Sequence, residues 1–451
     1  METSKYLTAL IKSLFGVVLF YLLYLTSNIV IIKEYVEDPA FDKVVNRFSS
    51  THQLLKNVPN IMLFGVDEYY LKNHDMINEL NQTTYGYTFP NDKIANFIQR
   101  LDKFVEKHKE QTPKALFIDY DYSFPTTVGG KNLTKEDNFF LEVLKKPHGY
   151  SIVLPKSRQE NFIESSSDAT IQKLIAEKKI IFSTVEVAES KDGTTRRFIA
   201  YKTYKNAKTE EDCNYSSVSL SLWRMFGNDA NFTEQSVVHN RFIVKDYASS
   251  QILIDEQNSS KSYLQQKSYW GGFYYYSADH SFENLDYDMF KDAIILLGST
   301  TKNIKRDSFK VVTGKELRGI ELQANMIMTH FYLNGGLKTF NIWKSSLLIF
   351  VVFYLLFLFG NQFINKILPN WVKIRLVPLL KEPLSFLLIM VVMFFLSWGI
   401  FYFYQEWFNW GVAGVLFKGI ELWKKIKEYS IKFWNWTKKY FIKFFKYIKG
   451  V

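Results

Sequence analysis

Residues 291–336 read KDAIILLGSTTKNIKRDSFKVVTGKELRGIELQANMIMTHFYLNGG, and this stretch determines how the rest of the chain is organised. Within it, the apolar run at 293–297 is short, partly β-branched and closed by Gly298, which is typical of a buried strand rather than a helix. A polar segment follows, and residues 317–325 then open a helix that leads to the first of the late apolar segments. The stretch is therefore predicted to connect a compact extramembrane domain to a membrane helix.

Upstream of this stretch, apolar strand patterns alternate with helical periodicity. The pattern predicts strands at 61–68, 115–121, 151–155, 180–187, 252–254 and 271–276, helices at 93–108, 137–144 and 217–225, and a turn at 192–197. Strands separated by helices at these spacings need crossover connections, so we expect an α/β domain with a mainly parallel or mixed sheet. Cys213 is the single cysteine, so no intrachain disulfide can stabilise this domain.

The composition points to a membrane-associated protein. A mean hydropathy of −0.11 over 451 residues conceals a polar middle between two apolar ends. The formal net charge of +11 is concentrated in a lysine-rich C-terminal segment beside apolar sequence, which favours anionic lipid headgroups over nucleic acid as the partner.

The apolar segments predict an extracytoplasmic domain flanked by transmembrane α-helices. Lys5 and Lys12 place the N-terminus in the cytoplasm, and nothing after the first segment resembles a signal-peptide cleavage site. The predicted order is a cytoplasmic N-terminus (1–13), a first membrane helix (14–32), a periplasmic domain (33–340), a second membrane helix (343–361), a basic cytoplasmic loop (362–382), a third membrane helix (383–404) and a possible fourth crossing (405–423). The chain would then lie in a bacterial inner membrane. Without the fourth crossing, the C-terminal segment would lie along the outer leaflet.

Residues 424–451 form an amphipathic pattern, with aromatic residues on one helical stripe and lysines on the other side. Such a helix is typical of the membrane interface. The residues expected to contact the membrane surface are Trp423, Lys424, Lys425, Trp436, Lys438 and Lys439. The alternative is an ordinary helix that packs on a partner's helix.

Polar side chains lie at the carboxyl ends of three of the predicted strands. Open α/β sheets bind ligands outside the carboxyl ends of their strands, so the candidate ligand-binding residues are Asp67, Glu68, Asp119, Asp121, Ser299 and Thr300, to which we add Asp307 and Glu321. The carboxylates could accept from an amine or hold a divalent cation, whereas the hydroxyls with Lys302, Lys305 and Arg306 could hold an anion. The alternative is that these residues only cap turns and helix ends.

Nothing in the sequence predicts an enzyme. The seven histidines fall in no recognisable triad or zinc spacing, and no glycine-rich phosphate loop is present. We therefore expect no catalytic residues, no metal and no cofactor. The tyrosine-rich run at 263–276 is either a carbohydrate or peptide surface or a strand whose rings pack on the sheet.

Several motifs together resemble the type-two CHASE domain, an extracellular sensory module of bacterial receptors. They are FGVDE at 64–68, YTFP at 87–90, FIDY at 117–120, DG at 192–193, LLGST at 296–300, Asp307 and GIELQAN at 319–325. The resemblance extends over residues 35–337 and implies one membrane helix before the domain and three after it. Members of the family usually continue into a cyclase, kinase, phosphodiesterase or regulator-type output module. This chain departs from that pattern, because too few residues follow Trp423 for one.

Two functions agree with these features. The first is a membrane-anchored periplasmic sensor that binds a ligand and passes its state through its membrane helices to a separate partner. The second is a structural or scaffold subunit of a bacterial envelope complex that uses the domain for protein–protein contacts. Membrane lipids, proteins of a complex or signalling pathway, and further copies of the chain are the expected partners.

Overall fold

The computed structural model describes residues 2–25, 38–49, 58–78, 83, 89–122, 133–156, 161–206, 211–227, 273–301, 308–335, 338–339, 341–367, 377–404 and 406–408. The chain divides into two compact units: residues 45–338, and residues 1–44 together with 339–451. The predicted strand at 252–254, Asp307 with its basic neighbours, and the amphipathic segment at 424–451 lie outside the described residues.

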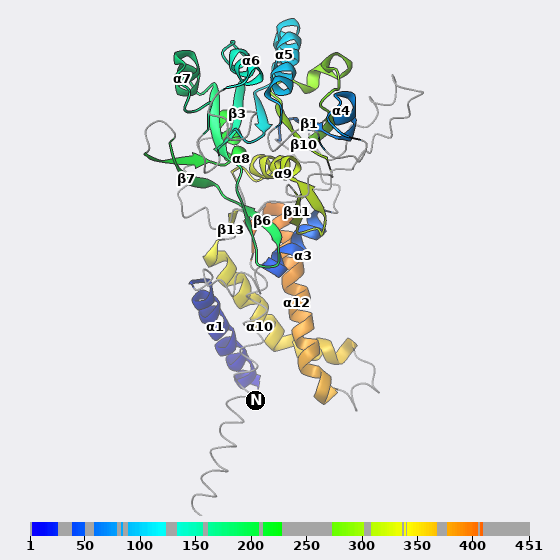
Figure 1. The fold of residues 1–451 in the computed structure, drawn as a ribbon. Coiled ribbons are helices and arrows are strands. Elements are labelled where there is room, and N and C mark those ends of the chain that lie inside the picture. Colours follow the sequence, from blue (N-terminus) through cyan, green and yellow to red (C-terminus); the bar gives the residue numbers. More distant parts are fainter. Residues whose placement is uncertain are drawn as a thin grey trace, which may run out of the picture. The chain divides into compact units, whose positions relative to one another are not determined.

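The centre of the 45–338 unit is a six-stranded sheet in which every pair of neighbours is parallel (Figure 1). Its strands are β1 (Ile61–Val66), β2 (Ala115–Asp119), β3 (Ser151–Lys156), β4 (Ile180–Thr184), β9 (Phe273–Ser277) and β10 (Ile294–Ser299), in the spatial order β4-β3-β2-β10-β1-β9. The predicted α/β class with a mainly parallel sheet is confirmed.

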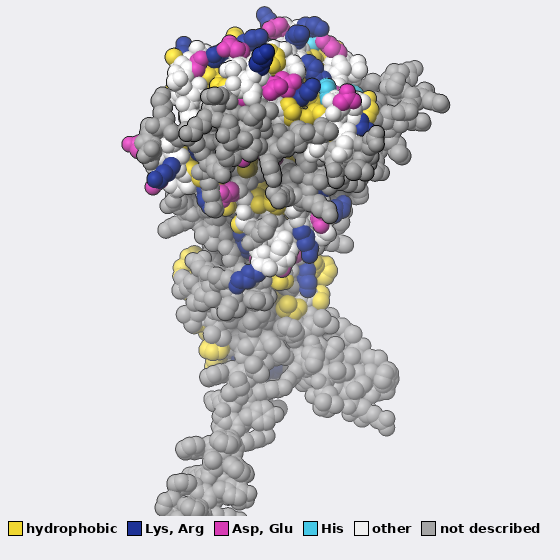
Figure 2. Space-filling view, viewed as in Figure 1, with side chains coloured by type: hydrophobic (Ala, Val, Ile, Leu, Met, Phe, Trp, Pro, Cys, Tyr) yellow, Lys and Arg dark blue, Asp and Glu magenta, His cyan; other side chains and the backbone are white. Residues whose placement is uncertain are grey.

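One side of this sheet is covered by the helices that follow β1, β2 and β3. They are α4 (Glu68–Asn73), α5 (Asn91–Lys107), α6 (Lys135–Leu144) and α7 (Ala169–Ala176), with the short 3-10 turns η2 (Lys109–Gln111), η4 (Phe282–Asn284) and η5 (Tyr287–Met289). Alternate strand residues point to this side, so Phe64 packs edge-on against Phe97 of α5 at a ring distance of 5.4 Å. Figure 2 shows acidic and basic side chains interspersed over the described part of this helical layer.

The opposite side of the sheet is covered by α8 (Val218–Met225) and α9 (Gly319–Tyr332), which pack on each other. Helix α9 also contacts β1 and β10 directly. The remaining alternate strand residues, such as Leu63 and Leu296, are fully buried on this side. The sheet is therefore buried on both sides, as its continuous apolar strands require.

Smaller sheets complete the unit. Strands β12 (Glu316–Arg318), β11 (Ser308–Val311), β6 (Thr194–Phe198) and β5 (Val187–Glu189) form one, and β7 (Tyr201–Lys205) pairs with β8 (Asp212–Ser216) in an antiparallel hairpin. The turn predicted at 192–197 is confirmed only at its start, where Gly193 adopts a φ of +72° and Asp192 accepts hydrogen bonds from Thr194 N and from Arg196. Residues 194–197 belong to β6 instead. The predicted helix at 317–325 begins only at Gly319, since the two preceding residues belong to β12.

The other unit is mainly helical. Its described elements are α1 (Glu2–Leu25), most of α3 (Asp38–Ser49), α10 (Ile342–Ile367), α12 (Val377–Tyr404) and β14 (Glu406–Trp407), with the two-residue β13 (Lys338–Thr339) at the boundary. Helices α1 and α10 pack together, and Tyr21 contacts Trp343 at a ring distance of 6.3 Å. Within the described residues, no helix has both the length and the apolar character needed to cross a membrane. The membrane helices remain predictions.

Candidate functional site

The carboxyl ends of the central strands bring the predicted residues together. Because β10 pairs with β1 on one side and β2 on the other, Gly65, Gly298 and Asp119 lie level with one another across three strands. Asp67 and Glu68 directly follow β1, Ser299 is the last residue of β10 and Thr300 directly follows it, so these residues share one edge of the sheet. Asp121, two residues beyond β2, is exposed to solvent.

The chain leaves these strands toward opposite sides of the sheet. After β1 and β2 it enters α4, α5 and α6, which cover one side, whereas after β10 it reaches β11, β12 and then α9 on the other. Neighbouring strands whose connections diverge in this way form a topological switch point, the place where open α/β sheets bind their ligands. The flanks of β10 are therefore the candidate binding position.

Asp67 is held by hydrogen bonds from two elements. Its Oδ1 accepts from the backbone N–H of Tyr70 at 2.8 Å, which makes Asp67 the N-cap of α4, and from Ser277 Oγ of β9 at 3.0 Å. Its Oδ2 accepts from the Tyr275 hydroxyl at 3.3 Å. The capping alternative is thus correct for Asp67, and the same carboxylate also ties β1 to β9.

Tyr275 and Thr300 meet above a glycine of the strand between them. The Tyr275 hydroxyl of β9 and Thr300 Oγ1, just after β10, lie 2.9 Å apart, and β1 separates their strands. A Cβ added to Gly65 would lie 2.4 Å from Thr300 Oγ1 and 2.7 Å from the Tyr275 hydroxyl. Only glycine leaves room for this contact.

Helix α9 packs closely against a second glycine, Gly298, which pairs with Gly65 in the neighbouring strand. A Cβ on Gly298 would lie 2.9 Å from Cβ of Ile320 and 3.1 Å from Cβ of Asp119. The next residue of α9, Glu321, accepts a hydrogen bond from the Arg318 N–H at 2.8 Å and so caps its own helix. The first turn of α9 is therefore seated against the end of β10.

The remaining polar residues at this edge of the sheet differ in their hydrogen bonding. Glu68 Oε1 accepts from Thr301 Oγ1 at 3.1 Å, which joins the start of α4 to the segment after β10. Ser299 Oγ is buried and has no hydrogen-bond partner among the described residues. We call Asp67, Tyr275, Ser277, Ser299 and Thr300, together with Asp119, the strand-end cluster.

A family model for the CHASE2 domain matches residues 14–360. The chain belongs to the CHASE2 domain family. The resemblance inferred from the sequence is confirmed, and the match includes the whole sheet and the strand-end cluster. No curated protein and no solved structure matches the chain. CHASE2 domains are sensory domains of the extracellular type, which supports a sensory role for this chain.

Burial dominates the electrostatics of the CHASE2 strand-end cluster. It raises the pKa of Asp67, to which the neighbouring Glu68 charge adds, while the bonds from Tyr70, Ser277 and Tyr275 act in the opposite direction. Burial and the Asp67 charge likewise raise the pKa of Tyr275, which stays protonated at physiological pH. Asp67 is therefore protonated at a higher pH than an ordinary aspartate.

The sequence did not identify Gly65, Tyr275 and Ser277 as members of the site. The predicted strand at 271–276 contained the signal, because β9 spans Phe273–Ser277 and places Tyr275 and Ser277 on the side of the sheet that faces α9. The strand interpretation of the tyrosine run is correct for these residues, and Tyr276 stacks on Phe64 at 5.4 Å on the other side. No group of three metal-ligating side chains occurs within the described ranges.

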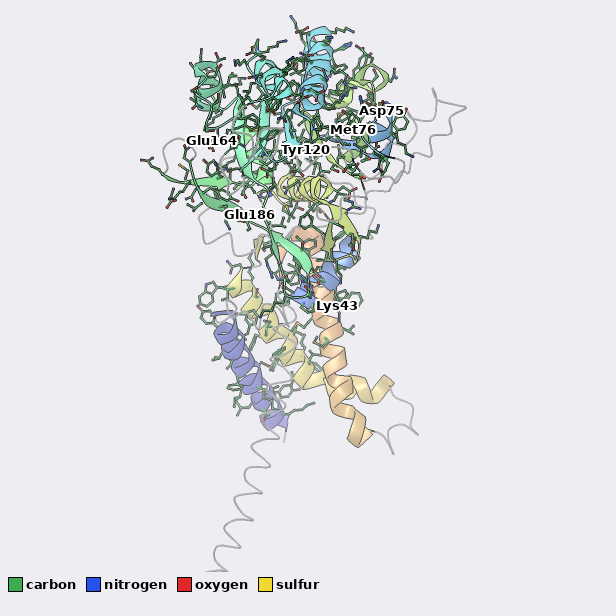
Figure 3. All side chains as sticks on the ribbon, in the orientation of Figure 1. Lys43, Asp75, Met76, Tyr120, Glu164 and Glu186 are labelled. Atoms are coloured by element: carbon green, nitrogen blue, oxygen red, sulfur yellow. The ribbon has the colours of Figure 1, made fainter. Side chains whose placement is uncertain are left out.

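A second polar group of the CHASE2 domain lies at the ends of β3 and β4. Lys156, the last residue of β3, is buried and pairs with the buried Glu164, which also accepts from the Tyr215 hydroxyl of β8 at 2.6 Å. In β4, Thr184 contacts the Tyr204 hydroxyl of β7, which donates to Glu186 at 2.7 Å. Figure 3 labels Glu164, Glu186 and, at the end of β2, Tyr120. These bonds fasten the β7–β8 hairpin to the sheet.

Proposed function

We propose that this CHASE2 protein is a membrane-anchored sensor that binds a small molecule at the strand-end cluster and passes its state to a separate partner. The observation that carries the proposal is the position of β10 between β1 and β2, with the chain leaving toward opposite sides of the sheet.

The contacts of α9 offer a route for the signal. Ile320 lies against Gly298 at the end of β10, and the charge of Glu321 contributes to the environment of Tyr275. A ligand that displaces Tyr275 or Thr300 would therefore change the packing of the first turn of α9. The same helix packs on α8, and the chain continues from it to residues 339–451.

We further propose that the unit formed by residues 1–44 and 339–451 is embedded in the bacterial inner membrane, with the CHASE2 domain in the periplasm. Its described side chains support this, because serines are buried while large apolar residues are exposed. Ser13 and Ser397 are both 0% exposed, whereas Leu347 and Phe395 are 66% and 60% exposed. Lipid is the environment that suits such a surface, and the lysine-rich segment at 424–451 would bind anionic headgroups.

The binding proposal is tested by a thermal-shift screen of small molecules on the full chain in detergent or nanodiscs. For any molecule that raises the unfolding temperature, Asp119→Ala should abolish the increase while leaving the unliganded protein nearly as stable. The matched control is Asp121→Ala, because Asp121 is exposed two residues beyond β2 and should retain the shift. If Asp119→Ala abolishes folding instead, the role of Asp119 is structural and the proposed site loses its support.

One observation favours the scaffold function as a second candidate. The space above Gly65 and Gly298 is filled by the protein's own Thr300, Tyr275 and Ile320. A structural subunit of an envelope complex needs no ligand at this edge of the sheet, and it would contact other proteins through the outer surface of the domain. The identity of the bound proteins separates the two functions, as set out at the end of the Discussion.

A further inference from the structure

We propose that Asp67, Tyr275 and Thr300 form a proton-operated switch, in which protonation of Asp67 turns the Tyr275 hydroxyl from β1 toward the end of β10. The inference deepens the proposed function by naming acidity as a regulator of the same cluster. It rests on that function only for the statement that the change is transmitted as a signal.

The geometry places one hydroxyl between two acceptors. The Tyr275 oxygen lies 3.3 Å from Asp67 Oδ2 and 2.9 Å from Thr300 Oγ1, and its single proton can be donated to one of them at a time. The hydrogen-bond donors to Asp67, from Tyr70, Ser277 and Tyr275, are all neutral. No ion pair with a described lysine or arginine holds this carboxylate in its charged form.

The direction of the hydrogen bonds through Tyr275 depends on whether Asp67 is ionised or protonated. With Asp67 ionised, Tyr275 donates to Oδ2 and the Thr300 hydroxyl donates to Tyr275. One proton taken from solvent settles on Oδ2, because Oδ1 already accepts two bonds. Asp67 then donates to the Tyr275 oxygen, and Tyr275 donates to Thr300 Oγ1. No bond other than these hydrogen bonds is made or broken.

The charges around Asp67 favour proton uptake. Glu68 adjoins it at the start of α4, Glu321 of α9 lies near Tyr275, and Asp119 of β2 lies on the same level across Gly298. Two residues of opposite charge, Arg100 of α5 and Asp279 in the turn after β9, interact with Tyr70. Burial raises the pKa of Asp67 further, so uptake begins at a higher pH than for an ordinary aspartate.

The switch acts on the segment that leads to α9. In the acidic state, the Thr300 hydroxyl accepts a hydrogen bond from Tyr275 instead of donating one to it. The Thr300 hydroxyl must then donate its own proton to a different acceptor. Thr301, the next residue, is bonded to Glu68 and lies in the same segment. A change of bonding at residue 300 thus reaches both the start of α4 and the polypeptide that precedes β11 and α9.

The test is pH-difference infrared spectroscopy of the full chain in nanodiscs, without added ligand. A protonated-carboxyl band should appear as the pH falls, with a midpoint above that of an ordinary aspartate, together with a shift of a tyrosine C–O band. Asp67→Asn should remove both signals, and the control Asp121→Asn should retain both. Tyr275→Phe should keep the carboxyl band, at a higher midpoint because one bond to the carboxylate is lost, and should remove the tyrosine shift.

Either of two results would overturn the switch: a wild-type protein with no Asp67 band at such a midpoint, or a tyrosine shift that does not follow the carboxyl band. If Asp67→Asn does not fold, the comparison of wild type with Tyr275→Phe decides the question alone. Because no ligand or partner is used, failure here leaves the sensor proposal standing, and failure of the ligand screen leaves the switch standing.

Discussion

Replacing Gly65 by alanine tests the packing at the centre of the strand-end cluster. The new methyl group would lie 2.4 Å from Thr300 Oγ1, 2.7 Å from the Tyr275 hydroxyl and 2.9 Å from Thr300 Cγ2, all closer than real Cβ contacts. Gly65 is not among the residues with positive φ, so alanine meets no backbone strain there. The cost must therefore come from overpacking and from the broken bond between Tyr275 and Thr300.

The magnitude follows from these two terms. Overpacking a filled site costs about 1–3 kcal/mol, and the lost hydrogen bond costs about 1 kcal/mol. Removing a glycine restricts the unfolded chain and returns about 0.4–1 kcal/mol. We expect Gly65→Ala to lower the free energy of unfolding by about 2 kcal/mol, which corresponds to a decrease of roughly 3–4 °C in the unfolding temperature for a domain of this size.

Thermal unfolding of the full chain, followed by circular dichroism, measures this effect. The matched control is Gly399→Ala in α12, where an added Cβ meets nothing within 4 Å, and this variant should be as stable as wild type or slightly more stable. Adding Thr300→Ala to Gly65→Ala should recover about 1 kcal/mol, because the nearest clashing atoms are removed. An unchanged unfolding temperature for Gly65→Ala would refute the described contact above β1.

Three further outcomes are expected. Lys156→Met should lower the free energy of unfolding, measured with denaturant, by about 3–5 kcal/mol, because Glu164 is left buried with an uncompensated charge. Adding Glu164→Leu should restore most of this loss. A loss below about 1 kcal/mol for Lys156→Met alone would contradict the buried pair. Burial lowers the pKa of His330 to about 4, so the stability it contributes is complete above about pH 6.5 and declines as the pH falls toward 4, by up to ~3 kcal/mol. His330→Phe should remove that decline, and an identical pH profile for both proteins would show that His330 is not its source. A peptide of residues 423–451 should bind anionic vesicles with an affinity that falls steeply with salt, and salt-insensitive binding would exclude headgroup attraction.

The sequence was sufficient for the local elements of the domain. The strands that became β1, β2, β3, β4 and β10 are short apolar runs with clear ends, and the helices α5, α6 and α8 begin within two residues of their predicted starts. These features depend on neighbouring residues only, through period, capping and turn chemistry. The α/β class followed from their alternation.

The strand order could not be read from the sequence, because it depends on pairing between distant residues. Strand β10 lies between β1 and β2 although more than half of the domain separates it from each of them in the chain. The contact of Tyr275 with Thr300 above Gly65 also requires the register of three strands, which no local pattern encodes. Glu321 is a ligand candidate from the sequence alone, whereas the structure shows that it caps α9. Its role as a helix cap follows from the backbone at Arg318, where no usual capping residue precedes it.

Asp67 illustrates how two interpretations of one residue can both hold. The alternative in which it caps a turn is correct, because it accepts the Tyr70 N–H at the start of α4. The same side chain still joins the cluster with Tyr275 and Ser277, and burial still raises its pKa. The capping role and the raised pKa therefore belong to the same carboxylate.

The most direct test of the sensory account is to isolate the full-length protein from its own membranes under native conditions and identify the bound proteins by mass spectrometry. The account predicts recovery of a cytoplasmic signalling protein, namely a kinase, a cyclase or a regulator, as the separate output partner. Recovery of motor, secretion or cell-wall components in fixed ratio, without any signalling protein, would contradict it and establish the chain as a structural subunit of an envelope complex.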